Sequence, residues 1–377
     1  MAATHLILLA LAAFSVALSA VAMARDTPLE WRFALTEPVS DATAATAPRF
    51  ETVFDYRVAT GQAHSPGIVL SDDGFALIWF QGSQEAQADV DIFAADFTRT
   101  GDLWQAGAPH RLITRAGLSD AFEPRQLVVT LGNTIQNEGA QQALYTTAVS
   151  IGGWAMASIA DVRMADGAPV RARKLNLSPL LNRSFLVKSP MVQYADGSHA
   201  LPAYFEMGRT YGSLVRLDAQ GRVRDMRRMP GRARAIQPMI VPLDASRAVA
   251  FLRDFDTTGG RLLISRTEDG GQSWSRVRQG DIANPSSPVA ALHLGEGRIL
   301  MAVNDDVARP DLLRLTLSAD GGQTWRALHE FSDGTGGALR YPMMRALPGD
   351  EILLSYSIGT KQGLRAHAFN RAWLAAQ

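Results

Sequence analysis

The chain has 377 residues, of which 47% are hydrophobic and 20% are charged, and it contains no cysteine. This composition is typical of a folded globular protein, and a chain without cysteine forms no disulfide, no thiolate metal site and no cysteine nucleophile. Because 37 basic residues balance 37 acidic ones, bulk charge argues against a nucleic acid partner.

The first 24 residues differ from the rest of the chain. The stretch Leu6–Ala24 is almost wholly apolar and uncharged, and it ends in Ala22-Met23-Ala24, a small-x-small cleavage pattern. These features predict a signal peptide over residues 1–24, followed by a linker over residues 25–48. The stretch could also just span a bilayer, so a retained anchor stays open as the alternative. We expect a periplasmic or secreted protein with no stable membrane insertion after cleavage.

Two turns further along the chain repeat each other. The segments Thr267–Trp274 and Ser318–Trp325 both fit S/T-x-D-x-G-x-S/T-W, and their aspartates lie 51 residues apart. Weaker echoes at Asp166 and Asp218 keep this register. A fixed period of this length indicates a repeat architecture.

Apolar runs broken by Gly or Asp turns recur with a similar period and predict β-hairpins. Two hairpins in each unit of roughly 50 residues give four strands, which is the content of one propeller blade. The sequence therefore predicts an all-β fold, a six-bladed β-propeller of four-stranded antiparallel blades, over residues 49–377. We expect Arg49–Val58 to add a strand that closes the ring, and we place the blades near residues 64–110, 123–175, 188–228, 237–280, 284–330 and 340–370.

The repeated turns themselves have a structural explanation. A short Asp side chain satisfies backbone N–H groups within its own turn, Gly supplies a positive φ, and Trp packs beneath the hairpin. The turns therefore mark blades, whereas the ligand site of a propeller is expected where strand-end loops converge on the central channel.

These turns resemble the Asp boxes of the sialidase (neuraminidase) superfamily, whose members are six-bladed propellers. More narrowly, the chain resembles a family of predicted bacterial neuraminidase-like proteins with Asp-box (BNR) repeats. The resemblance extends from about residue 50 to the C-terminus. The stretches that carry it are His64–Pro66, Phe80–Val90, Leu180–Lys188, Leu201–Glu206, Gly231–Pro238, Phe251–Asp254, Asn284-Pro285, Asn304 and Arg340–Pro342.

A sialidase holds its substrate carboxylate with three arginines, and it uses a tyrosine nucleophile helped by a glutamate and an aspartate as acid/base. The resemblance implies Asp89 as the acid/base and Tyr341 as the nucleophile. His64 stands where the first arginine is expected, and Asn284 where the glutamate is expected, while Arg309 is the candidate for the arginine before the second Asp box. Since histidine supplies neither the planar fork nor the permanent charge of arginine, standard sialic acid is a doubtful substrate.

The other polar residues expected at the channel mouth also have side chains that can take part in catalysis or bind a ligand. His64, Glu85 and Asp89 would combine an imidazole with an acid pair near one blade's inner edge. A further set could hydrogen-bond sugar hydroxyls or an anionic substituent: Lys188, Glu206, Arg234, Gln237, Arg253, Asp254 and Asn304. The histidines show no metal-ligand spacing, so we expect no metal and no cofactor.

The leading hypothesis is an exported sialidase-like exo-glycosidase for an acidic or modified glycan. Asp89 would protonate the leaving oxygen, and Tyr341 would attack or stabilise the anomeric carbon. Three alternatives stay open: a polysaccharide lyase that uses His64 and Tyr341 as base and acid, a non-catalytic glycan- or envelope-binding propeller, and a protein-docking platform. For the exo-glycosidase, the lyase and the glycan- or envelope-binding propeller, the expected partner is a glycan or glycoconjugate.

Overall fold

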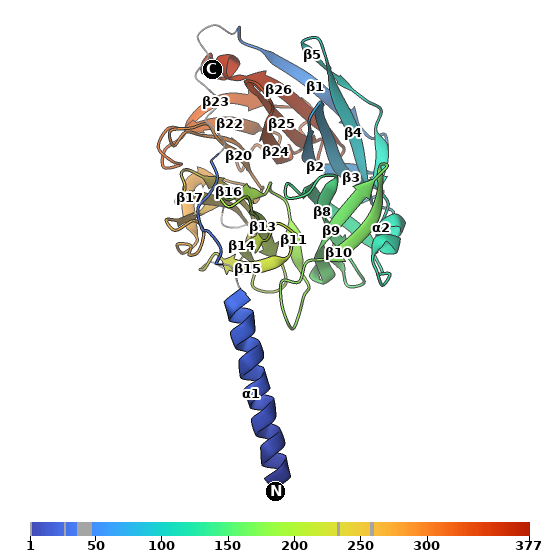
Figure 1. The fold of residues 1–377 in the computed structure, drawn as a ribbon. Helices are drawn as coiled ribbons and strands as arrows, with labels where there is room; N and C mark the ends of the chain where they lie inside the picture. The colour runs from blue at the N-terminus through green and yellow to red at the C-terminus, as the bar shows by residue number, and fades with distance from the viewer. Residues whose placement is uncertain (1, 26–27, 36–46, 232–233, 257–259) are drawn as a thin grey trace. The chain divides into compact units, whose positions relative to one another are not determined.

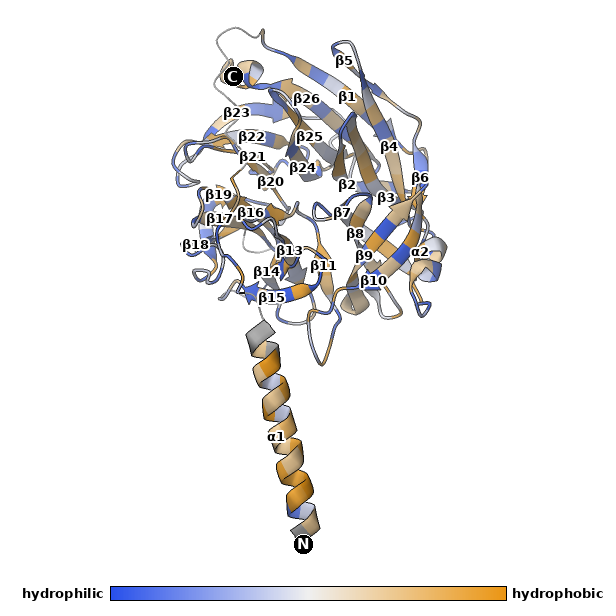
Figure 2. Cartoon of the chain, in the orientation of Figure 1, coloured by the Kyte–Doolittle hydropathy of each residue, from blue (hydrophilic) through white to orange (hydrophobic). Residues whose placement is uncertain are grey.

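The computed structural model describes residues 2–25, 28–35, 47–231, 234–256 and 260–377. The chain divides into two units, Met1–Trp31 and Arg32–Gln377. The first contains helix α1 (Ala2–Arg25), whose stretch Ala3–Val21 has a mean hydropathy of 2.1 and is long and apolar enough to cross a membrane. Figure 2 shows hydrophobic residues along this helix. The helix is consistent with a signal sequence.

The second unit consists of six antiparallel sheets arranged as the blades of a propeller (Figure 1). The predicted fold of four-stranded blades is therefore confirmed. Blade 1 comprises β2 (Gln62–Ser71), β3 (Gly74–Gly82), β4 (Asp91–Thr100) and β5 (Leu103–Ala106), with β6 (His110–Ile113) also paired to β4. Blade 2 comprises β7 (Thr130–Gln136), β8 (Ala143–Val149), β9 (Ala157–Ala165) and β10 (Ala168–Lys174).

The remaining blades follow in chain order. In blade 3 the innermost position is shared by β11 (Phe185–Val187) and β12 (Val192–Gln193), followed by β13 (His199–Phe205), β14 (Tyr211–Leu217) and β15 (Val223–Arg228). Blade 4 comprises β16 (Ala235–Pro242), β17 (Ala248–Asp254), β18 (Arg261–Thr267) and β19 (Arg278–Ala283). Blade 5 comprises β20 (Ala290–His293), β21 (Ile299–Val303), β22 (Leu313–Ser318) and β23 (Arg326–Phe331).

Blade 6 joins the two ends of the propeller. Its strands β24 (Arg340–Ala346), β25 (Glu351–Ile358) and β26 (Gly363–Asn370) are completed by β1 (Phe50–Arg57), which pairs with β26. The predicted closing strand is thus present, and its Phe50 ring packs against His367 and Trp373 at centroid distances of 4.9 and 4.8 Å. Short helices α2 (Arg115–Ala121), η2 (Gly153–Met156) and α3 (Arg371–Ala375) lie outside the sheets.

Two blades begin later than the sequence predicted. Blade 2 starts at Thr130 and blade 5 at Ala290, instead of near residues 123 and 284. Pro288 lies two residues before the start of blade 5, and a proline cannot donate to a strand ladder. The blades bury both faces against their neighbours, as the uniformly buried pattern of β25 illustrates. Residues 32–34, predicted as linker, reach the propeller, where Phe33 bridges Tyr194.

The two Asp boxes connect the third and fourth strands of blades 4 and 5. In the first box, Asp269 Oδ1 accepts hydrogen bonds from Ser273 N at 2.9 Å and from Thr267 Oγ1 at 2.8 Å. Trp274 is only 6% exposed beneath the turn. The carboxylate is therefore engaged within its own turn, in the same way as Asp320 in the second box.

We expect Asp269→Ala to lower the free energy of unfolding by about 1–2 kcal/mol, because the turn loses its side-chain acceptor. Partial burial opposes ionisation of Asp269, but hydrogen bonds from Ser273 and Thr267 outweigh it and lower its pKa. The carboxylate therefore stabilises the fold above the pKa of unfolded aspartate, and this contribution is lost as the pH falls through the lower folded-state pKa. Denaturant unfolding measures both effects. Equal stability of variant and wild type at neutral pH would contradict them.

Candidate functional site

Three innermost strands begin with the same backbone irregularity. Near the starts of β2, β16 and β24 the register against the neighbouring strand shifts. Within each shift lies one non-glycine residue with a positive φ that precedes a proline: Ser65 (57°), Gln237 (52°) and Tyr341 (56°). Non-glycine residues rarely occupy this left-handed region, and such strain clusters at functional sites. Bulges of this kind re-aim side chains, so the three strand starts are where a site is expected.

Tyr341 lies at the centre of the resulting cluster. Arg253, at the end of β17, donates a hydrogen bond from Nη1 to Tyr341 Oη at 3.2 Å. The His64 ring meets the Tyr341 ring edge-on, with centroids 4.4 Å apart. These contacts join blades 1, 4 and 6 at one end of their inner strands.

Arg253 extends the cluster to blades 3 and 5. Its Nε donates to Ser286 Oγ at 3.1 Å, and its Nη1 also donates to Gln237 Oε1 at 3.3 Å. Gln237 Nε2 in turn donates to Tyr204 Oη at 3.4 Å. One guanidinium therefore links polar groups from four blades, and it fixes their positions relative to Tyr341.

The cluster is electropositive around a neutral imidazole. His64 is completely buried, and its two ring nitrogens have no hydrogen-bond partner among the described residues. Burial lowers the pKa of His64 well below its usual value, and the charges of Lys361, Arg253 and Arg340 lower it further. Burial also lowers the pKa of Arg340, as does nearby Arg253. Neighbouring cations of this kind favour the binding of an anion.

Two glutamates lie beside these cations. Burial raises the pKa of Glu206, while Arg253 opposes this shift and Glu85 adds to it. Glu85 itself forms an ion pair with Lys361, which lies in the turn between β25 and β26. A carboxyl group with a raised pKa next to a second carboxylate is suited to hold a proton for general acid chemistry.

Asp89 is held in a different way. It lies on the exposed loop between β3 and β4, where its carboxylate accepts hydrogen bonds from Ser83 N and Ser83 Oγ, each at 3.0 Å. Within the described parts of the chain, Asp89 forms no hydrogen bond or ion pair with Tyr341 or His64. Its carboxylate is therefore bonded within its own loop and not to the side chains of the cluster.

Three predicted ligand residues bind the protein's own backbone. Lys188 Nζ donates to Val289 O at 3.2 Å and to Pro342 O at 2.5 Å, and burial lowers its pKa to about 7. Asn284 Nδ2 donates to Asn304 O, and Asn304 Nδ2 donates to Leu312 O. These hydrogen bonds fix loops at the strand ends, and the one from Lys188 reaches the carbonyl that follows Tyr341.

Three other predicted residues bond to groups outside the cluster. The exposed Arg309 forms an ion pair with Asp311 at 3.0 Å, and the exposed Arg234 donates to Phe255 O at 3.4 Å. In the described segments neither guanidinium bonds to Tyr341, His64 or Arg253. The buried Asp254 accepts a hydrogen bond from Asp256 N at 3.0 Å.

Sequence reasoning missed Lys361 and Ser286 as members of the cluster. Lys361 lies in a hairpin turn and Ser286 in a loop, and no sequence motif marks either. The X-Pro pairs that open the inner strands were a usable signal, because Ser65, Gln237 and Tyr341 all precede proline. Because all three pairs open an inner strand, together they indicate a site at that end of the inner strands.

The fold and this convergence of side chains define a six-bladed propeller with a polar site at one end of its inner strands. Residues 73–351 match the family model described as BNR repeat-like domain, and the chain belongs to this family. No curated protein matches the sequence significantly.

Solved structures share the fold at low sequence identity. The Hadza microbial sialidase has a TM-score of 0.63 and 13% identity over 81% of this chain and 65% of its own. Trypanosoma rangeli sialidase in complex with the inhibitor DANA has a TM-score of 0.58 and 13% identity over 83% of this chain and 55% of its own. A protein of unknown function from Dyadobacter fermentans has a TM-score of 0.65 and 14% identity over 85% of this chain and 99% of its own. The chain thus spans about two thirds or less of the two sialidases, and the similarity shows the fold alone.

We expect His64 to remain neutral throughout the range between about pH 5 and 8 in which a free histidine titrates. Its lowered pKa means that the unfolded state binds a proton that the folded state does not, so this residue makes the fold less stable as the pH falls below about 6.5. NMR titration of the imidazole resonances measures this directly. A midpoint near 6.5 for His64 would contradict its burial.

Proposed function

We propose that the chain is an exported sialidase-like exo-glycosidase that acts on an acidic or modified glycan. The observation that carries this proposal is the position of Tyr341, whose hydroxyl accepts a hydrogen bond from Arg253 at 3.2 Å beside the neutral His64. A phenol placed among cations is a suitable nucleophile, because their positive field stabilises negative charge on its oxygen.

The cations also suggest the chemical class of the substrate. The guanidinium group of Arg340 offers a planar fork that matches a carboxylate or another oxyanion, and Arg253 and Lys361 add positive charge beside it. His64 replaces the expected third fork with a neutral ring. We therefore propose an acidic sugar whose anionic group differs from that of standard sialic acid in size or placement.

Two groups are candidates for the proton donor. Asp89 would protonate the leaving oxygen if the loop between β3 and β4 moved toward the bound sugar. Glu206 is already beside Arg253, and its raised pKa favours the protonated form that a general acid requires. In either case Tyr341 attacks or stabilises the anomeric carbon, and water then completes the hydrolysis.

A polysaccharide lyase remains the second candidate, and one observation favours it. The imidazole nitrogens of His64, which have no hydrogen-bond partner among the described residues, lie beside the Tyr341 ring, and the two groups are candidates for base and acid on a uronate. For both functions we propose export through the apolar N-terminal helix, which gives a periplasmic or secreted protein.

We expect Tyr341→Phe to reduce kcat by about 100-fold or more in a glycan-release assay, because the nucleophilic or proton-transferring oxygen is removed. Tyr56→Phe is the matched control, since Tyr56 lies on the outer strand β1 and its hydroxyl donates to Gln81 on β3 and not to the cluster. Asp89→Asn and Glu206→Gln, assayed in parallel, identify the proton donor as the variant with the larger loss. Turnover that survives Tyr341→Phe would contradict the proposal.

The reaction products separate the two candidate functions. A hydrolase releases a saturated reducing sugar, whereas a lyase releases an unsaturated uronate that absorbs in the ultraviolet. We expect release of reducing sugar without a rise in ultraviolet absorbance. Binding of acidic glycans with no product of either kind would instead favour the non-catalytic propeller.

A further inference from the structure

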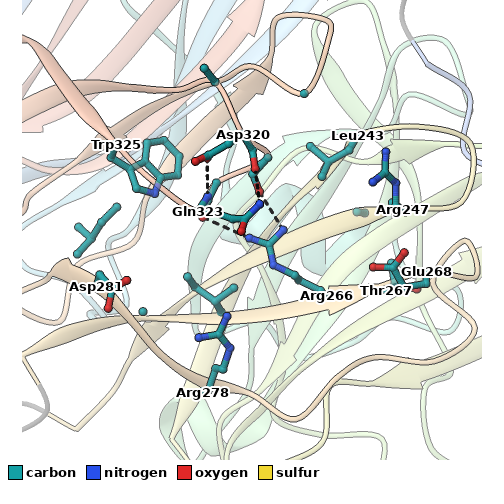
Figure 3. Close-up of a pocket in the computed structure, with 18 of the residues that line it drawn as sticks. Leu243, Arg247, Arg266, Thr267, Glu268, Arg278, Asp281, Asp320, Gln323 and Trp325 are labelled. Atoms are coloured by element: carbon teal, nitrogen blue, oxygen red, sulfur yellow. Dashed lines mark hydrogen bonds between the residues drawn. The ribbon is translucent and has the colours of Figure 1, made fainter.

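A cavity of 740 Å³ lies between blades 4 and 5, lined by side chains from β18, β19 and the second Asp box (Figure 3). None of the Tyr341 cluster lines it. The strand ends that carry the Asp boxes are opposite to those that carry the cluster, because β17 runs from the turn at Arg247 toward Arg253. The cavity is therefore distinct from the candidate active site.

The preceding junction, between blades 3 and 4, shows how such a space is normally filled. There Tyr194 follows β12 and donates a hydrogen bond to Gly270 O, in the first Asp box, at 2.7 Å. Phe33 packs against the Tyr194 ring at a centroid distance of 5.1 Å. A Cβ added at Gly271 would lie only 2.6 Å from Leu214. Tyr194, Phe33 and Leu214 therefore pack closely beneath this box.

Leu243 occupies the place of Tyr194 in the junction between blades 4 and 5. The equivalence follows from the strand register. Val192, two residues before Tyr194, pairs with Ala200 on the second strand of blade 3. Val241, two residues before Leu243, pairs in the same way with Val249 on the second strand of blade 4. Leucine is shorter and lacks the hydroxyl. Here Arg266 makes the hydrogen bonds to the backbone of the second Asp box, donating to Gly321 O at 2.8 Å and to Gly322 O at 3.3 Å.

With leucine in the position of tyrosine, the space beside the second Asp box is not filled by a side chain from blade 4. Trp325 is half-buried and lines the cavity, whereas Trp274 in the first box is 6% exposed. A half-exposed indole offers an apolar face to a ligand while its other contacts, such as the edge-on packing with Phe251 at 5.7 Å, hold it in place.

The polar lining has unused hydrogen-bonding capacity. Across the described residues, the side chains of Arg278, Glu268 and Asp281 form no hydrogen bond or ion pair, and Figure 3 shows all three around the same cavity as Arg266 and Trp325. Guanidinium and carboxylate groups are planar and can each bind two neighbouring hydroxyls. Opposite charges are both present, so the lining suits a ligand without strong charge of its own.

We propose that this cavity is a second carbohydrate-binding site, which takes a neutral oligosaccharide with one pyranose ring against Trp325 and its hydroxyls on Arg278, Glu268 and Asp281. The volume lies within the range of about 300–1,000 Å³ that small-molecule sites occupy. The site is independent of the chemistry at Tyr341, and it would hold a glycan to the protein whether or not the central cluster cleaves it.

Isothermal titration of the purified protein with maltotriose, cellotriose and triacetylchitotriose tests the proposal. We expect at least one of these neutral trisaccharides to bind, and Arg278→Ala to weaken that binding about tenfold or more, as loss of hydrogen bonds to a charged group does. Arg276→Ala is the matched control, because this exposed arginine is two residues away and does not line the cavity. Binding of none of the three, or equal effects of the two arginine variants, would overturn the proposal.

Two further variants separate this site from the central one. Leu243→Tyr restores the residue that fills the neighbouring junction, and we expect it to abolish trisaccharide binding without changing the turnover of a small glycoside. Tyr341→Phe should leave trisaccharide binding intact even where it abolishes turnover. Loss of trisaccharide binding in Tyr341→Phe would place the ligand in the central cluster and overturn the proposal, whereas absence of any turnover would count only against the proposed enzymatic function.

Discussion

The left-handed backbone at the starts of the inner strands is the constraint on which the candidate site depends. Ser65, Gln237 and Tyr341 each hold a positive φ, a conformation that costs of order 1–3 kcal/mol at a non-glycine residue. Surrounding contacts hold this backbone in place: Ser357 Oγ accepts a hydrogen bond from Ser65 N, and Lys188 donates to the carbonyl that follows Tyr341. Because the bulges occur at one strand end in separate blades, they bring side chains distant in sequence into contact.

The two ends of the propeller's strands carry different kinds of polar groups. At one end, the carboxylates of Asp269 and Asp320 accept hydrogen bonds within their own turns and stabilise them. At the other end, the guanidinium of Arg253 links the hydroxyls and amides of neighbouring blades around a buried imidazole. A repeat scaffold permits this division, since each blade needs the packing of its neighbours but only one end of the channel has to carry polar groups.

The fold could be predicted from the sequence because its signals are local and periodic: the Asp-box turns, the alternating strands and the closing strand at Arg49–Val58. The resemblance to sialidases pointed to Tyr341 and His64, and the structure places both beside Arg253 and Gln237, at the ends of the strands β2, β16, β17 and β24. The conformation of exposed side chains could not be predicted, since no sequence motif marks the local bonds by which Asp89 binds Ser83 and Arg309 binds Asp311. The cavity beside Trp325 depends on one leucine in place of a tyrosine, which only strand register reveals.

A double-mutant cycle on the free energy of unfolding tests most directly whether blades 4 and 6 meet through Arg253 and Tyr341. Arg253→Met, Tyr341→Phe and the double variant would be compared with wild type by denaturant unfolding. The account predicts a coupling free energy of about 0.5–3 kcal/mol, the range for residues in direct contact. Strict additivity of the two substitutions would show that the strand starts do not share one pocket, and it would contradict the site described above.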